Sequence, residues 1–352
     1  MTTASTIRCG QRRIGASEPC FVIAEAGSNH NGSLEQALRL IDVAADAGAD
    51  AVKFQVFRAA KLYPQTAGLT DYLKLDKPIY DIIAELELPY EWLPALAERT
   101  RERGLAFMAS AFDEESVDRL DPFVEIHKIA SYELTHHPLI EHVARTGKPL
   151  ILSTGTADLA EVADAVAAYR AAGGEQLVLL QCTAAYPAPL DSLNVRAMAS
   201  LSTAFGVPAG LSDHSRDPVI GPVAAVAAGA VVVEKHYTLG NELPGPDHAF
   251  AIEPKELAQL VAAVRATEQA LGSGEKVMAP VEAELHDFAR RFIFAVAPIA
   301  PGEEITARNA AVLRKGKNAR GLEARDWNGT LGRRATRALS AGEPIAAADL
   351  AA

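Results

Sequence analysis

The residues best suited to chemistry stand directly after short apolar runs. One run, AVVV, is followed at once by Glu234, Lys235 and His236, and another leads into Ser212 and His214. Successive residues of a strand point to opposite faces, so Glu234 shares a face with His236, as Ser212 does with His214. Two neutral imidazoles beside a carboxylate suit Mn²⁺, Zn²⁺ or Fe²⁺ in an open site. The two histidines therefore predict a metal site, with a hydrogen-bonded structural role as the alternative.

Two lysines occupy positions where a charge is unexpected. Lys53 and Lys128 lie among β-branched and aromatic residues, in AVKFQ and EIHKIAS. Burying a charged side chain there is costly unless something anionic pairs with it. Two lysines near hydroxyls and backbone N–H groups suit a ligand that carries a phosphate and a carboxylate, such as phosphoenolpyruvate. Internal ion pairs with Glu25 or Glu133 are the structural alternative.

Polar side chains follow each run that we expect to be a strand. They are Glu25; Lys53 and Gln55; Ser110; Lys128, Ser131 and Glu133; Ser153 and Thr154; Gln181, Thr183 and Tyr186; Ser212, Asp213 and His214; and Glu234, Lys235 and His236. In a barrel of parallel strands these ends meet at one mouth, so the side chains would form a single site. Loops are polar because they are exposed, and this alone explains some of the serines.

Eight apolar runs alternate with segments of helical periodicity. The expected strands lie at 21–24, 50–55, 105–109, 124–130, 149–152, 176–181, 207–212 and 230–235, and the expected helices follow Ser33 and lie at 90–103, 114–120, 138–145, 159–171, 195–204, 219–228 and 254–271. Eight such units in about 250 residues predict an α/β fold of the (β/α)₈ or TIM-barrel class. A doubly wound sheet is the alternative, but no GxGxxG motif follows the first strand.

The alternation of apolar runs and helical segments ends after Gly272. A Gly-Ser-Gly stretch and polar residues precede short apolar segments with Pro-Gly and Ala-Gly turn signals. We therefore expect a barrel domain at 1–275, a linker at 276–290 and a small β-rich domain at 291–352. So small a core is marginal alone, which favours packing against the barrel or a partner subunit.

Composition excludes several classes of protein. The chain has 352 residues, 49% of them hydrophobic, and a net charge of −11 without a long basic run, so we expect no nucleic-acid partner. An anionic substrate would need a local cationic pocket. Three widely spaced cysteines favour reduced thiols and a cytoplasmic location. No apolar stretch approaches the roughly 18 residues of a membrane span, and the first residues have no secretion signal.

Eight motifs occur in order along the chain: IAEAGSNHNG (23–32), VKFQ (52–55), HKIASYE (127–133), PLILSTG (149–155), CTAAYP (182–187), GLSDHS (210–215), VEKHYTL (233–239) and GPDHAF (245–250). Together they resemble the sialic acid synthases and the bacterial relatives that make legionaminic, pseudaminic and spore-coat sugars. The tail resembles the antifreeze-like (SAF) domain of that family. The resemblance covers nearly the whole chain, and eight motifs in order are highly specific.

The resemblance implies a metal-dependent condensation of phosphoenolpyruvate with an open-chain N-acylated hexosamine, which gives a nine-carbon 2-keto acid and phosphate. It implies a divalent metal on His214 and His236, with Mn²⁺ expected and Mg²⁺ or Co²⁺ as alternatives. Phosphoenolpyruvate would contact Lys53, Ser110, Lys128, Ser131, Ser153 and Ser212. The sugar would face Glu25, Gln55, Tyr186 and Asp247. Besides Lys53 and Lys128, the catalytic groups would be Glu25 or Glu133, either of which could position water or move protons.

The resemblance also implies a homodimer in which the tail domains are swapped. Arg314, in AVLRKGK, matches the arginine that family members insert into the partner's site. The small domain would then close the mouth and contact the N-acyl group.

Two departures bear on the acceptor sugar. Ala184 stands where N-acetylneuraminate synthases usually carry Asn, and HKIASYE replaces their KIGSGE-like motif. Both favour the pseudaminic or legionaminic branch, whose acceptors are 2,4-diacetamido-deoxyhexoses. A 3-deoxy-keto acid synthase that uses a sugar phosphate is a second hypothesis and predicts a further Arg/Lys cluster. A non-catalytic carbohydrate-binding protein on the same scaffold is a third and predicts loss of the lysines or histidines.

Overall fold

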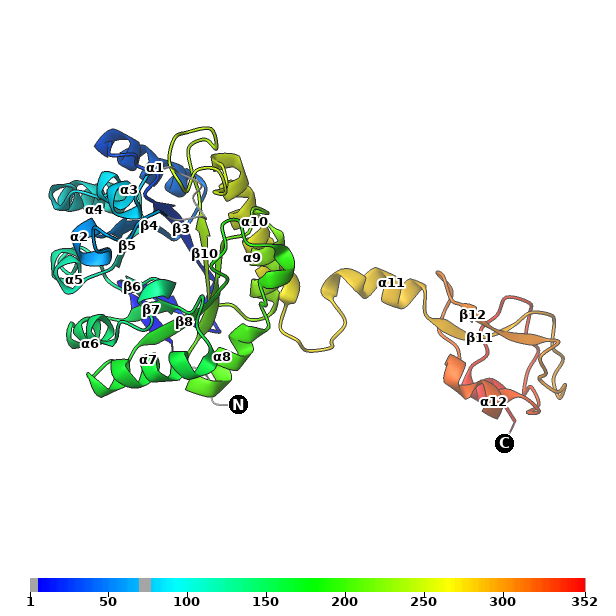
Figure 1. The fold of residues 1–352 in the computed structure, drawn as a ribbon. Helices are drawn as coiled ribbons and strands as arrows, with labels where there is room; N and C mark the ends of the chain where they lie inside the picture. Colours follow the sequence, from blue (N-terminus) through cyan, green and yellow to red (C-terminus); the bar gives the residue numbers. More distant parts are fainter. Residues whose placement is uncertain (1–5, 70–76, 352) are drawn as a thin grey trace. The chain divides into compact units, whose positions relative to one another are not determined.

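The structure is a computed structural model that describes residues 6–69 and 77–351. The chain divides into two compact units, Met1–Gly272 and Ser273–Ala352 (Figure 1). The division falls within the Gly-Ser-Gly stretch at residues 272–274. Each unit is described by itself.

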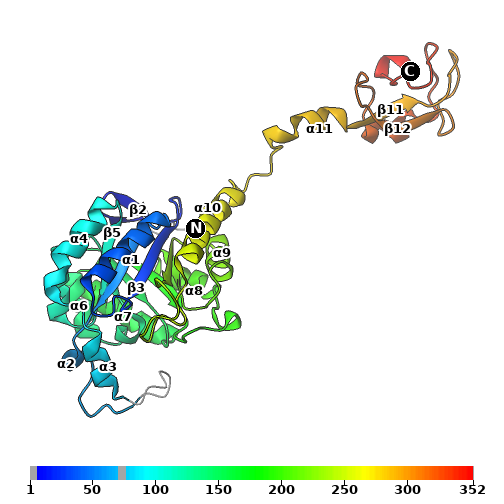
Figure 2. The same ribbon diagram turned by 90° about the horizontal axis from the view of Figure 1, so that it is seen from above.

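Eight parallel strands form a closed barrel in the first unit (Figure 1 and Figure 2). They are β3 (Phe21–Gly27), β4 (Ala51–Val56), β5 (Ala106–Ala111), β6 (His127–Ile129), β7 (Leu150–Ser153), β8 (Leu177–Cys182), β9 (Ala209–Asp213) and β10 (Val232–His236). Each strand pairs with the next along the chain, and β10 closes the ring against β3. The predicted (β/α)₈ barrel is confirmed, although β6 is shorter than the expected 124–130.

Helices surround the barrel, and the longer ones turn an apolar face toward the strands. They are α1 (Leu34–Asp46), α2 (Ala59–Leu62), α3 (Ile79–Glu85), α4 (Leu93–Glu102), α5 (Glu114–Leu120), α6 (His137–Arg145), α7 (Leu159–Ala171), α8 (Ala197–Phe205), α9 (Ile220–Ala227) and α10 (Pro254–Leu271), with 3₁₀ turns η1 (Tyr90–Trp92), η2 (Ser131–Glu133) and η3 (Leu190–Ser192). The limits of α5, α7 and α10 are those predicted, whereas α2 and α3, in a long insertion at residues 56–89 between β4 and α4, are not predicted. None of the described helices is long and apolar enough to cross a membrane.

A hairpin that the sequence did not predict, β1 (Ile7–Cys9) and β2 (Arg12–Ile14), precedes the barrel. Its Ile7 and Ile14 are fully buried in one apolar cluster with Phe21 and Ile23 of β3. The same cluster contains Ala51, Met108, Ile126, Ile151, Val178, Leu180, Val231 and Val232 from the other strands and their approaches. Side chains therefore fill the amino-terminal end of the barrel. A cavity can form only at the other end, where the strands have their carboxyl ends.

Asp50, directly before β4, joins three parts of this closed end. Its buried carboxylate accepts a hydrogen bond from Val22 N at 2.8 Å. It also pairs with Arg12 Nη2 at 2.6 Å and with Arg265 Nη2 of α10 at 2.7 Å. One carboxylate thereby connects the hairpin, the first two barrel strands and the last barrel helix.

The second unit is small and rich in loops. It contains η4 (Pro280–Glu282), α11 (Ala283–Phe288), β11 (Arg291–Ala295), β12 (Ala310–Arg314), η5 (Ala324–Asp326), α12 (Trp327–Thr330) and η6 (Ala347–Asp349). β11 and β12 pair antiparallel, and isolated bridges such as Ile299 with Leu339 add further pairing. Its core consists of Ile293, Ala295, Ile299, Ile305, Ala310, Ala335, Leu339 and Ile345. The region predicted as a linker includes η4 and α11.

We expect Arg265→Met to lower the free energy of unfolding of the barrel by about 1–3 kcal/mol, because buried Asp50 loses one charged hydrogen-bond partner and keeps Arg12. Urea unfolding followed by circular dichroism measures this. Arg101→Met, which changes an exposed arginine of α4, is the control and should have little effect. Equal stability of the two variants would show that Arg265 does not support the closed end.

Candidate functional site

A cavity of about 650 Å³ lies at the carboxyl ends of the barrel strands. Most of the predicted site residues line it: Glu25, Lys53, Gln55, Ser110, Lys128, Ser131, Ser153, Tyr186, Ser212, His214, His236 and Asp247. Glu133 is not among the lining residues, and Arg314 belongs to the second unit. The strand ends thus converge as a closed barrel requires.

The floor of the cavity is a cluster of buried charges. Lys53 Nζ pairs with Glu25 Oε2 at 2.7 Å and donates to Ser110 Oγ at 3.0 Å. Lys128 Nζ donates to Ser153 Oγ at 2.8 Å. Both lysines are at most 3% exposed. The internal ion pair of Lys53 with Glu25, which the sequence left as an alternative, is therefore present.

Glu234 lies between the two lysines. Its Oε2 is 3.7 Å from Lys53 Nζ, its Oε1 is 3.7 Å from Lys128 Nζ, and Ser212 Oγ donates to Oε1 at 2.9 Å. Burial would raise the pKa of Glu234, but Lys128 and Lys53 outweigh it and hold this pKa below its usual value. Burial lowers the pKa of Lys128, and Glu234 only partly offsets this. Lys128 is thus a buried cation whose nearest described carboxylate is beyond hydrogen-bond distance.

Strand register explains why these side chains meet. Glu25 stands beside Lys53 in the β3–β4 pair, and Ser110 stands beside Lys128 in the β5–β6 pair. Ser212 stands beside Glu234 in the β9–β10 pair. Neighbours in register point to the same face of a sheet, so the six chain segments deliver their polar groups to one floor.

The two predicted metal-binding histidines are neighbours at the mouth. The ring centroids of His214 and His236 are 5.3 Å apart. His214 Nδ1 lies 2.9 Å from the carbonyl oxygen of Thr183, so Nδ1 carries a proton and Nε2 is the ring nitrogen that could bind a metal. His236 Nδ1 is buried without a hydrogen-bond partner, and burial lowers the pKa of His236 well below its usual value. His236 is therefore a neutral imidazole. Burial lowers the pKa of His214, but the neighbouring Cys182 outweighs burial and raises this pKa above its usual value, so a metal at His214 would displace a proton.

The described residues contain no group of three or more His, Cys, Asp or Glu side chains that could hold a metal ion. The protein therefore offers two imidazoles, and water or substrate oxygens would supply the remaining ligands. An open site with few protein ligands fits a metal that contacts the substrate.

Aromatic rings form the wall beside the histidines. The Tyr186 ring lies 4.4 Å from that of His214 and 5.1 Å from that of Phe250, measured between centroids. Phe250 in turn lies 5.2 Å from His236. Such a wall excludes water from one side of the imidazoles and offers an apolar surface to a ligand.

The two candidate acid–base carboxylates differ in position. Glu25 lines the cavity, accepts a hydrogen bond from Gln55 Nε2 at 3.0 Å, and has its pKa raised to about 7 because burial outweighs the effect of Lys53. Burial also raises the pKa of Glu133 to about 8, and its Oε2 has no partner among the described residues. Only Glu25 reaches the cavity, which favours it for proton transfer.

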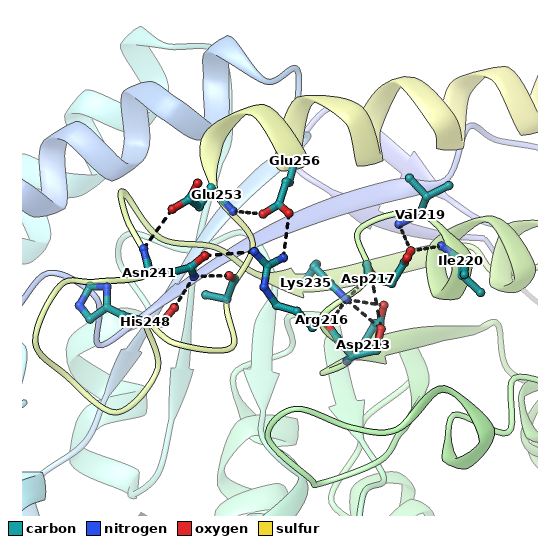
Figure 3. A network of polar contacts seen from close by, with 12 residues as sticks. Asp213, Arg216, Asp217, Val219, Ile220, Lys235, Asn241, His248, Glu253 and Glu256 are labelled. Carbon is teal, nitrogen blue, oxygen red and sulfur yellow. Dashed lines mark hydrogen bonds and ion pairs between the residues drawn. The ribbon is translucent and has the colours of Figure 1, made fainter.

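Asp247 reaches the cavity from the loop after β10, and burial raises its pKa to about 6. Gly27 makes room for it, since a Cβ there would lie 2.9 Å from Asp247 Oδ2. The loop is held by Asn241, whose Nδ2 donates to the carbonyls of His248 at 2.6 Å and Ala251 at 2.8 Å (Figure 3). Arg216 Nη2 donates to Asn241 Oδ1 at 3.0 Å and so connects this loop to the one that follows His214.

Some cavity residues were not predicted. Glu234 was expected at the mouth, but its position between the two lysines was not predicted. Others come from the insertion and its neighbours and are mostly apolar: Phe57, Leu62, Tyr63, Ile82, Ile83, Leu86 and Phe112. Helices α2 and α3 thereby contribute Leu62, Ile82 and Ile83 to the cavity. Arg314 ends β12, where it stands opposite Arg291 and is exposed.

Comparisons with known proteins identify the family of this chain. The model of the NeuB family matches residues 40–276, and that of the SAF domain matches residues 290–351. The chain is 40% identical over 337 residues to the spore coat polysaccharide biosynthesis protein SpsE of Bacillus subtilis, covering 91% of this chain and 90% of the relative. It is 39% identical over 340 residues to the N,N'-diacetyllegionaminic acid synthase of Legionella pneumophila, covering 94% of each.

A solved structure shows the same fold. The N-acetylneuraminic acid (sialic acid) synthetase of Leptospira borgpetersenii, in complex with citrate, matches with a TM-score of 0.72 at 35% identity, covering 81% of this chain and 96% of that one. The family resemblance of the motifs is confirmed, as is the SAF domain. The chain belongs to the NeuB family and carries a C-terminal SAF domain.

Proposed function

We propose that this chain is a nonulosonic acid synthase, a transferase that condenses phosphoenolpyruvate with an open-chain N-acylated hexosamine and releases phosphate. The observation that carries the proposal is the meeting of two buried lysines with two neighbouring imidazoles in one cavity. Relatives named as sialic-type acid synthases, which share more than a third of the residues over nearly the whole chain, support it.

The floor suits phosphoenolpyruvate. Lys53 and Lys128 would bind its phosphate and carboxylate, and Ser110, Ser131, Ser153 and Ser212 would donate hydrogen bonds to their oxygens. Lys128 lacks a close carboxylate, so an anion beside it would gain a charge-assisted hydrogen bond. Glu25, Gln55, Tyr186 and Asp247 would face the sugar.

The reaction follows from the chemistry of an enol phosphate. The C3 carbon attacks the sugar aldehyde and forms the new C–C bond, the aldehyde oxygen takes a proton, and C2 becomes cationic. Water adds to C2 and loses a proton. The bond between C2 and the phosphate oxygen then breaks, the new C2 hydroxyl passes its proton to the departing phosphate, and the 2-keto acid is left. Lys53 and Lys128 stabilise negative charge on the phosphate and carboxylate, while Glu25 would move the protons.

A divalent metal would be held by His214 and His236, with Mn²⁺ expected from the imidazole ligands and Mg²⁺ or Co²⁺ as alternatives. When bound, it would supply Lewis-acid polarisation of the aldehyde oxygen. The wall of Tyr186 and Phe250 would keep bulk water from this part of the cavity.

The acceptor would be a 2,4-diacetamido-deoxyhexose. Ala184 removes the Asn amide expected for an N-acetylneuraminate synthase, and the apolar residues of the insertion suit deoxy and acyl groups. A sugar phosphate is disfavoured: apart from Lys53 and Lys128, the described cavity has one cation, Lys77, which pairs with Glu85.

We expect phosphate release from phosphoenolpyruvate to need both an N-acyl hexosamine and a divalent metal, with EDTA abolishing it and Mn²⁺ restoring it. His214→Ala and His236→Ala should each lose at least about 100-fold in kcat, because a Lewis acid lowers the barrier by several kcal/mol. His142→Gln, on the outer helix α6, is the control. If no acceptor triggers phosphate release, in a panel that includes N-acyl hexosamines and sugar phosphates, the synthase proposal is refuted. Full activity of His236→Ala would refute only the metal assignment.

We expect kcat/KM to rise with pH through about 7, where Glu25 loses its proton and becomes a base. Below this pH the neutral carboxyl cannot accept a proton, so the rate falls. Glu25→Gln should remove this acidic limb of the pH profile, that is, the rise of kcat/KM through about pH 7, and lower kcat by roughly 10²–10⁴-fold. Glu133→Gln should keep the limb; if it instead loses the limb while Glu25→Gln retains it, the proton carrier is Glu133.

A homodimer with swapped tails would bring Arg314 of one chain to the site of the other. Mixing inactive His236→Ala chains with inactive Arg314→Ala chains should then restore activity, because each mixed dimer has one intact barrel served by an intact Arg314. Roughly half of the dimers in a refolded mixture would be mixed, and each of these would have one active site out of two. We therefore expect the rate of phosphate release to approach about a quarter of the wild-type rate. No recovery, in a mixture shown to contain mixed dimers, would mean that Arg314 does not act across the dimer.

A further inference from the structure

Lys235 points away from the cavity, on the opposite face of β10 from Glu234 and His236. Its side chain is 2% exposed. Nζ pairs with Asp213 Oδ2 at 2.7 Å, donates to Asp217 O at 2.9 Å and to Ser215 Oγ at 3.1 Å, and also donates to Ser215 O (Figure 3). An ammonium has three protons, so these partners use its whole donor capacity.

Neighbouring residues form a buried site that fits this ion pair. Asp213 is fully buried, and its Oδ1 accepts a hydrogen bond from Ser215 N at 2.8 Å. Gly221 of α9 leaves the space for its carboxylate, since a Cβ there would lie 2.5 Å from Oδ2. Asp217 Oδ1 accepts from Val219 N at 2.8 Å and so holds the far end of the same loop. The charges are enclosed between strand and helix.

The chain positions of these residues relate them to the histidines. Asp213 directly precedes His214 and Ser215 directly follows it, while Lys235 directly precedes His236. One ammonium therefore fixes the backbone on both sides of His214 and next to His236. Successive side chains of a strand point to opposite faces, so holding Lys235 on the outer face of β10 directs His236 to the inner face. His214 directly follows β9, and holding Asp213 and Ser215 on either side of it restricts the direction of its imidazole.

Stability alone does not account for the pair. Removing two charges from water costs so much that apolar replacements of a buried ion pair are often neutral or stabilising. Apolar side chains, however, cannot bind the carbonyls of Ser215 and Asp217, which lie in the loop after His214. What the ion pair adds is directional control of that loop.

We propose that the Asp213–Lys235 pair is a positioning element that sets the spacing and direction of the His214 and His236 imidazoles for a shared divalent metal. The inference rests on the proposed role of the two histidines as metal ligands. Neither Asp213 nor Lys235 would touch the metal or the substrates.

The test measures Mn²⁺ binding by the full-length chain, from the electron paramagnetic resonance signal of free Mn²⁺. Lys235→Met should raise the Kd by roughly tenfold or more, the effect typical of groups that orient metal ligands. Hydrogen exchange of residues 214–219, measured without metal, should also become faster. The double variant Asp213→Asn with Lys235→Met leaves no unpaired buried charge, so it should fold and still show weak Mn²⁺ binding.

Arg265→Met is the matched control, because it also removes a cation from a buried aspartate, Asp50, at the closed end of the barrel. It should lower the melting temperature and leave the Kd for Mn²⁺ unchanged. Wild-type affinity in both Lys235 variants, or an equal loss in Arg265→Met, would overturn the positioning role while leaving the metal site intact. If wild-type protein binds no Mn²⁺, the metal assignment fails, and the inference fails with it.

Discussion

The site depends on ionised side chains that are held where water is excluded. Lys53, Lys128 and Glu234 are almost completely buried. Glu234 stabilises both lysines and is stabilised by them, and a serine hydroxyl group contacts each of the three side chains. An isolated charge there would be very costly, so the cluster exists only as a set. The two lysines are not paired equally: the nearest carboxylate to Lys53 is Glu25 at 2.7 Å, whereas the nearest described carboxylate to Lys128 is Glu234 at 3.7 Å. The protein therefore leaves one cation under-satisfied, which is the state in which binding an anion gains most.

The closed barrel makes this arrangement possible. A ring of parallel strands has all its carboxyl ends on one side, and the β1–β2 hairpin with its apolar cluster fills the other side. Register then decides which side chains meet, as in the pairs Glu25 with Lys53 and Ser212 with Glu234. A slip of one residue in β10 would exchange Glu234 for Lys235 on the floor and remove the carboxylate between the lysines. The apolar cores on both sides of the sheet fix that register.

Much of this could be predicted from the sequence because it is local. Apolar runs located the eight strands, and polar residues at their ends located the charged and hydroxyl-bearing floor of the cavity and its two histidines. The β1–β2 hairpin could not be predicted, since each strand has three residues and its burial depends on distant partners. Helices α2 and α3 lie in a segment with little periodicity. The position of Glu234 between Lys53 and Lys128 is a contact among three strands far apart in the chain, and spacing along one strand cannot show it.

The stretch Glu234, Lys235, His236 illustrates the limit most clearly. Strand parity places Glu234 and His236 on one face and Lys235 on the other, but the sequence cannot show what Lys235 contacts there. The structure divides them: Glu234 and His236 face the cavity, and Lys235 faces Asp213 behind the sheet. The β9–β10 register repeats the division, with Ser212 beside Glu234 and Asp213 beside Lys235. Two adjacent strands thus carry reactive groups on one face and an ion pair on the other. Holding Lys235 or Asp213 in place therefore also holds the next residue, His236 or His214, because only one peptide unit separates the two.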